Sequence, residues 1–255
     1  MKIIVTELIK TTNNLFPSRK EVRMIIGVIG LAIFISISEL LMAHFFSLLI
    51  LPDKPRSSGS LIFLSCIFLL SFAVLRLANF AKEHYKLRVF EQSFNNQEKK
   101  DRASDSWRWA TAMELTTLLS MCGRLIVLSA ILFYFSPIFG ICNLLIGVGV
   151  FQVLSYRLSQ QFESQYNFRH KQLIKEPVTN AEKVRTRIIA GEIGSLASSA
   201  GLIFLFGILI FLYAKDYVDP AKAFVLFIAI RMVGQIYSGF SSGLMRFARA
   251  RVYSE

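Results

Sequence analysis

Residues 201–255 read GLIFLFGILIFLYAKDYVDPAKAFVLFIAIRMVGQIYSGFSSGLMRFARARVYSE. An apolar run ends near Tyr213, a short polar turn follows at 215–220, and a second apolar run continues into an arginine-rich end. Each run offers about 20 apolar residues, enough to cross roughly 30 Å of hydrocarbon as a helix. The stretch therefore predicts a helical hairpin that crosses a bilayer twice, with its turn on one side.

The composition of the whole chain is also that of a membrane protein. Of its 255 residues, 54% are hydrophobic and 18% are charged, and the mean hydropathy is +0.50. A soluble domain of this size rarely has such a composition. The formal net charge of +12 indicates loops that face anionic lipid head groups. Since no nucleic-acid-binding motif accompanies the basic residues, we expect membrane lipid and no nucleic acid as a partner.

Four more apolar runs precede the hairpin, so the predicted fold class is all-α, a polytopic membrane protein with six transmembrane helices. The predicted spans are about 24–51, 61–94, 108–135, 138–175, 181–213 and 221–250. The connections carry turn signals: two prolines and a Ser/Gly cluster in 51–60, the pair Ser136–Pro137, and Pro177.

Residues 1–23 form a separate segment before the first span. Four apolar side chains are assigned to one helical face: Ile3, Ile4, Leu8 and Ile9. Pro17 ends this helix. The pattern is typical of a short helix that lies in the membrane interface, and the alternative is a solvated N-terminus.

The distribution of lysine and arginine predicts the orientation in the membrane. Five lie in 1–23, seven in 82–108, seven in 157–187 and three in the C-terminal tail, whereas only four lie in the connections on the other side. By the positive-inside rule, both termini and both long hairpins are cytoplasmic.

The order of features in 201–255 resembles the fifth and sixth spans of the ABC exporter transmembrane domain. There a short outer turn leads to a last helix that runs into the cytoplasm with an A-x-A-R-like ending, here within RFARARVYSE, residues 246–255. Exporter domains also begin with an interfacial elbow helix, and they alternate short outer turns with two cytoplasmic helical hairpins. Residues 61–134 and 138–213 would be those hairpins. Each arm of about 37 residues is roughly 55 Å long and protrudes roughly 25 Å beyond the bilayer.

The resemblance implies a homo- or heterodimer in the bacterial inner membrane whose hairpin tips dock on ATPase domains. The partner-docking candidates at the two tips are Asn96, Glu98, Lys99, Asp101, Arg102, Lys171, Lys175 and Glu176.

Two features depart from the family: the hairpins are shorter, and the sequence contains no phosphate-binding G-x-x-x-x-G-K-[ST] motif. We therefore expect no enzyme activity and no cofactor in this chain, with ATP and magnesium held by a separate ATP-binding protein. The predicted function is the transmembrane subunit of an ABC-type transporter that exports a substrate. The alternative is an exporter-like membrane scaffold, pore or effector protein without an ATPase partner.

Three ionisable residues lie deep in the predicted spans. Glu39, Arg124 and Arg231 are each about ten to twelve residues, roughly 15–18 Å, from the outer ends of their helices. Charges near the midplane are costly and usually face the interior or a wet cavity. With Gln235 they are the substrate-pathway candidates. One interpretation is a buried Glu–Arg pair that fixes packing, and the other is a polar cavity lining.

Cysteine and histidine give no sign of a metal site or a catalytic group. Cys66, Cys122 and Cys142 lie inside apolar runs without a C-x-x-C pair, as small buried hydrophobes do. The three histidines are far apart in the sequence.

Overall fold

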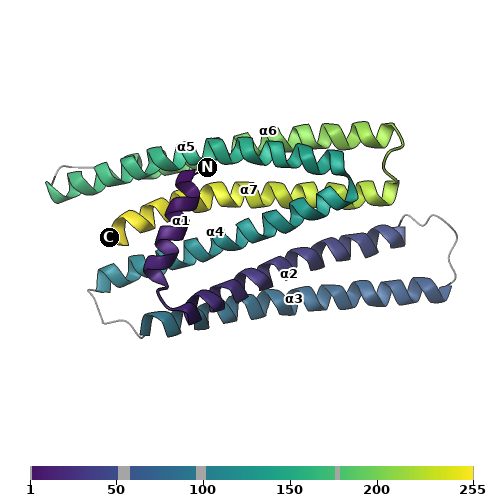
Figure 1. Ribbon diagram of the computed structural model, residues 1–255, viewed down its shortest axis with the longest axis horizontal. Helices are drawn as coiled ribbons and strands as arrows, with labels where there is room; N and C mark the ends of the chain where they lie inside the picture. The colour runs from purple at the N-terminus through teal and green to yellow at the C-terminus, as the bar shows by residue number, and fades with distance from the viewer. Residues whose placement is uncertain (1, 51–57, 96–101, 176–178, 255) are drawn as a thin grey trace.

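The computed structural model describes residues 2–50, 58–95, 102–175 and 179–254, and this part of the chain is helical apart from short connections. Seven helices follow one another (Figure 1): α1 (Lys2–Leu15), α2 (Arg19–Ile50), α3 (Ser58–Asn95), α4 (Arg102–Phe135), α5 (Pro137–Leu173), α6 (Asn180–Ala214) and α7 (Pro220–Ser254). The predicted all-α fold class is confirmed.

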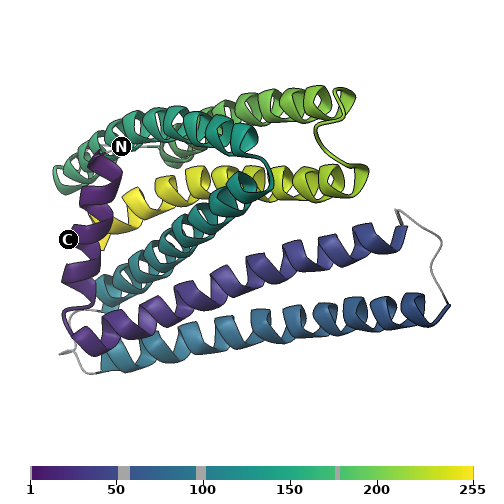
Figure 2. The ribbon, with the colours of Figure 1, turned by 45° about the vertical axis from the view of Figure 1, so that its right-hand side comes forward.

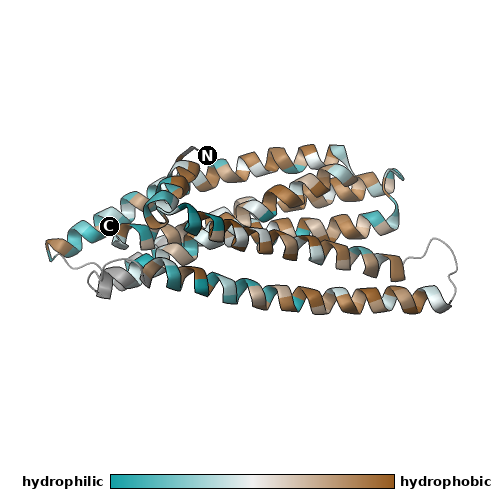
Figure 3. Ribbon diagram, turned by 60° about the horizontal axis from the view of Figure 1, so that its bottom comes forward, coloured by the Kyte–Doolittle hydropathy of each residue, from teal (hydrophilic) through white to brown (hydrophobic). Residues whose placement is uncertain are grey.

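Helices α2 to α7 are each long and apolar enough to cross a membrane, as the sequence predicts. They contain 32 to 38 residues, which corresponds to roughly 48–57 Å of helix against about 30 Å of hydrocarbon. Hydrophilic residues gather where the two termini lie, and hydrophobic residues dominate the rest of the helices (Figure 3). The chain is therefore built as a multi-pass membrane protein.

The helices start and end close to the predicted spans. The largest difference is at α4, which begins at Arg102 rather than near 108. Helix α5 packs along α6, whereas α3 packs along α2. The C-terminal ends of α3 and α5 and the N-terminal ends of α4 and α6 all lie at the end of the molecule that holds both termini (Figures 1 and 2). The protrusion of these helix ends into the cytoplasm, and the dimer, stay predictions.

Helix α1 lies across the long helices at that same end (Figure 1) and packs against α4 and α5. Ile4 and Leu8 are buried, whereas Ile3 and Ile9 are exposed by 44% and 56%. The sequence-based grouping of all four on one face is therefore wrong. One face packs on protein, and the opposite face keeps apolar side chains free to meet lipid, which suits the predicted interfacial location.

The molecule is organised around α7. Over half of its apolar window, 56%, is buried, against 11% for α3. Helix α7 packs against α2, α4, α5 and α6, whereas α3 packs along α2. Helix α3 meets α4 near its C-terminal end, where Phe90 packs edge-on against Trp109. The result is a larger group, α4 to α7, with the pair α2–α3 at its side.

The corner between α4 and α5 is a close approach of two backbones. Ser136 is extended at the N-cap of α5 and is followed by Pro137 in the first turn, the position where proline's fixed φ suits a helix start. A Cβ added at Gly140 would lie 2.5 Å from the Cα of Phe133. Only glycine fits there, and α5 can turn back directly beside α4.

Candidate transmembrane cavity

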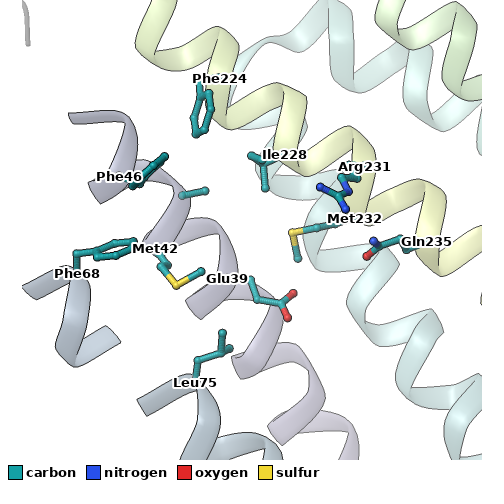
Figure 4. Close-up of a pocket in the computed structure, with 11 residues that line it drawn as sticks. Glu39, Met42, Phe46, Phe68, Leu75, Phe224, Ile228, Arg231, Met232 and Gln235 are labelled. Carbon is teal, nitrogen blue, oxygen red and sulfur yellow. The ribbon is translucent and has the colours of Figure 1, made fainter. Parts of the chain in front are cut away.

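A cavity of about 470 Å³ lies between α2, α3 and α7. Its walls are largely apolar, and they include Met42, Phe46, Phe68, Leu75, Phe224, Ile228 and Met232. Three polar side chains share it: Glu39 from α2, and Arg231 and Gln235 from α7 (Figure 4). The structure thus brings three of the four substrate-pathway candidates around one space.

Helix periodicity explains why α7 contributes two polar groups. Arg231 and Gln235 are four residues apart and so lie on one helical face. Both are exposed, while Ile230, directly before them, and Val233, between them in sequence, are buried in the core. The polar face of α7 therefore turns toward α2 and away from α4, α5 and α6.

The fourth candidate, Arg124 on α4, neutralises Glu39. Its guanidinium Nη2 lies 3.5 Å from Oε2 of Glu39, and its Nε donates a hydrogen bond to Oγ of Ser36 at 2.5 Å. Ser36 is completely buried and donates in turn to the carbonyl of Ala32. Arg124 is thus fixed by two α2 side chains one turn apart.

Arg231 has no such partner. Within the residues that the structure describes, it forms no ion pair or hydrogen bond. The Glu39–Arg124 pair is close to neutral, so Arg231 gives the cavity a net positive charge. It lies about 11 residues, roughly 17 Å, from the N-terminal end of α7, a depth at which a charge within a bilayer is costly without compensation.

Contacts near the C-terminal end of α2 and the N-terminal end of α7 bound the cavity on that side. Oγ of Ser47 donates to the carbonyl of Ala221 at 3.0 Å. The ring of Phe46 lies 6.0 Å from that of Phe224, centroid to centroid, and 5.6 Å from that of Phe68.

The partner-docking candidates are only partly visible. Asn96, Glu98, Lys99, Asp101 and Glu176 lie outside the described residues. Arg102 begins α4, and Lys171 and Lys175 are exposed around the C-terminal end of α5. Lys175 has a left-handed φ of 57°, a common ending for a helix. Docking by these residues stays a prediction.

The C-terminal end of α7 differs from the sequence-based interpretation, which took RFARARVYSE as a polar helical end; its extension into the cytoplasm stays a prediction. Phe247, Ala248 and Val252 are fully buried. The guanidinium of Arg169 on α5 donates to the Val252 carbonyl, and the Tyr253 ring stacks on Trp107 of α4 at 5.1 Å. Phe247, Ala248 and Val252 recur at helical spacing in the sequence, and this pattern could have predicted that one face of the α7 end packs against other helices.

Two polar links between helices were also missed. The Lys86 ammonium on α3, which is 8% exposed, donates to Oγ1 of Thr117 on α4 at 3.3 Å. Arg246 on α7 pairs with Glu114 on α4 at 2.6 Å. In the sequence, Lys86 and Arg246 enter only the count of positive charges that predicts orientation, because the sequence does not show which helices face one another.

Among the described residues, no group of three or more His, Cys, Asp or Glu side chains could hold a metal ion. The three cysteines are free thiols, with Cys66 exposed and the other two half-buried.

Comparisons with models of protein families and with curated proteins give no significant match.

Proposed function

We propose that this protein is the transmembrane subunit of a transporter that works as a dimer with separate ATP-binding subunits, as its resemblance to the ABC exporter transmembrane domain implies. One observation carries the proposal: two helix groups, α2–α3 and α4–α7, flank a cavity that holds an uncompensated charge at mid-depth. Intramembrane charges that face a cavity mark substrate or ion pathways.

The two helix groups supply the parts that alternating access requires. The pair α2–α3 meets the larger group mainly through α2, which packs against α4 and α7. Helix α3 is held to α4 by the hydrogen bond from Lys86 to Thr117 and by the contact of Phe90 with Trp109. Rocking of α2–α3 against α4–α7 then changes which side of the cavity is open, while each group moves as a rigid body.

The ATPase partner acts at the end of the molecule where both termini lie. The helix ends that flank the two connections, those of α3 to α6, lie there (Figure 1), and the docking candidates belong to these helix ends and to the residues between them in sequence. In this proposal the termini and both connections are cytoplasmic, in a bacterial inner membrane. ATP and magnesium bind to the partner, and closure of the partner pushes the helix pairs together.

Exchange of residues 96–101 for a Gly/Ser linker tests the partner. We expect the native chain to co-purify with an ATPase in stoichiometric amount and the exchanged variant to insert in the membrane without it. The matched control exchanges 51–57, the connection at the opposite end, and should keep the complex. A native chain that purifies without any ATPase would contradict the transporter and favour the scaffold or pore.

A further inference from the structure

The cavity opens on the flank of the helix bundle. Phe68 and Leu75 border it from α3, and Phe224 and Ile228 border it from α7. Helix α3 packs along α2 and not along α7, so the space between them is left to the cavity (Figure 4). This opening lies between membrane-capable helices, so it faces lipid when α3 and α7 span a bilayer. A molecule dissolved in the bilayer can enter it without first passing through water.

The polar end of the cavity selects for charge. Glu39 is held 3.5 Å from Arg124, so it offers little attraction to a cation. The guanidinium of Arg231 is left with no partner in the described part of the chain and shares the space with the amide of Gln235. A guanidinium binds a carboxylate or a phosphate through two parallel hydrogen bonds.

We propose that this cavity binds an anionic amphiphile taken from the membrane. Its head group lies at Arg231 and Gln235, and its apolar chain lies along Phe46, Phe68 and Phe224. This inference rests on the proposed function, for which it names the substrate class. The volume of about 470 Å³ is within the range of small-molecule sites, roughly 300–1,000 Å³.

The location of Arg231 fits movement of such a molecule across the bilayer. An anionic head group that crosses the membrane has its highest electrostatic cost near the midplane. Arg231 lies at that depth and carries the opposite charge. A free inorganic anion would leave the apolar walls unused, and a cationic amphiphile would be repelled, so both are weaker ligands.

Photoaffinity labelling of the full chain in phosphatidylcholine nanodiscs tests the proposal. Three probes share one diazirine-tagged alkyl chain and differ in a terminal carboxylic acid, alcohol or amine. We expect the acid to label peptides that contain residues 39–46 and 224–235 more strongly than the alcohol or the amine. Arg231→Gln should reduce labelling by the acid about tenfold, as for a lost charge-assisted hydrogen bond, and leave labelling by the alcohol unchanged.

Arg76→Gln is the matched control, because Arg76 lies on α3 over the Phe72 ring and does not line the cavity. The Arg76→Gln variant should label more strongly with the acid than with the alcohol, as the native chain does. Arg231→Lys keeps the positive charge and should retain most of this preference. If Arg231→Gln does not fold, Phe68→Trp fills the apolar wall and should reduce labelling by all three probes. Equal labelling by acid and alcohol in the native chain would overturn the proposal.

The outcomes distinguish failure of the anionic-amphiphile site from failure of the proposed transporter function. Equal labelling by all probes in a chain that co-purifies with an ATPase removes the anionic substrate and keeps the transporter. Labelling that depends on Arg231 in a chain without an ATPase keeps the site and removes the transporter.

Discussion

The carboxylate of Glu39 is the centre of the charge balance inside the membrane. It pairs with Arg124, and Arg231 is left on the cavity. We predict that Glu39→Ala lowers thermal stability in detergent, by an amount up to about 2.5–3.5 kcal/mol for a fully uncompensated charge. The side chains are 27% and 32% exposed, so solvent screening reduces the loss to about 1–2 kcal/mol.

Arg231→Gln provides the contrast within the same cavity, since it removes a charge that forms no ion pair with any residue that the structure describes. We expect it to leave stability unchanged or slightly higher. Glu83→Ala is the surface control, because Glu83 pairs with Lys82 at 58% exposure and exposed pairs contribute about 0–1 kcal/mol. Equal melting temperatures for Glu39→Ala and Glu83→Ala would show that the Glu39–Arg124 pair has no structural role.

At the scale of elements, the corner between α4 and α5 depends on one glycine. A Cβ at position 140 would meet the Cα of Phe133 at 2.5 Å and its side chain at 2.6 Å. Since a backbone atom cannot rotate away, Gly140→Ala must separate the two helices. We predict destabilisation of about 1–3 kcal/mol, typical of overpacking, measured as a lower melting temperature in detergent.

Gly149→Ala, in the same helix α5, is the matched control. A Cβ there would meet nothing within 4 Å, and alanine favours a helix over glycine by about 1 kcal/mol. Gly149→Ala should therefore be neutral or stabilising. A melting temperature for Gly140→Ala at or above that of Gly149→Ala would mean that the corner relaxes freely.

For the whole molecule, the structure fixes which segments share an end, and the charge distribution predicts which end is cytoplasmic. We predict that a cysteine at Tyr217, 75% exposed between α6 and α7, reacts with an impermeant thiol reagent in intact cells. A cysteine at Leu173, also 75% exposed, should not. Both are introduced after Cys66, Cys122 and Cys142 are replaced by alanine. Labelling at position 173 with protection at position 217 would show that the chain has the opposite orientation in the membrane.

The sequence alone determined the number, type and approximate bounds of the membrane-capable helices. Apolar runs of this length are helical because a helix satisfies its backbone hydrogen bonds within one segment, without any partner. Pro137 and Pro220, which the sequence pattern assigns to turns, each begin a helix one residue before the predicted span. The depth of Glu39, Arg124 and Arg231 also follows from residue counts, because a helix rises by a constant distance per residue.

Only the tertiary structure decided which charges meet. Glu39 and Arg124 lie 85 positions apart, and their pairing depends on the rotation and crossing of α2 and α4, which no local pattern encodes. The same holds for the buried end of α7 at Val252 and for the two faces of α1. A side chain is buried when another helix packs over it, and this depends on the tertiary arrangement. Because the helix faces toward protein and toward lipid are similarly apolar in this chain, the sequence pattern does not distinguish them.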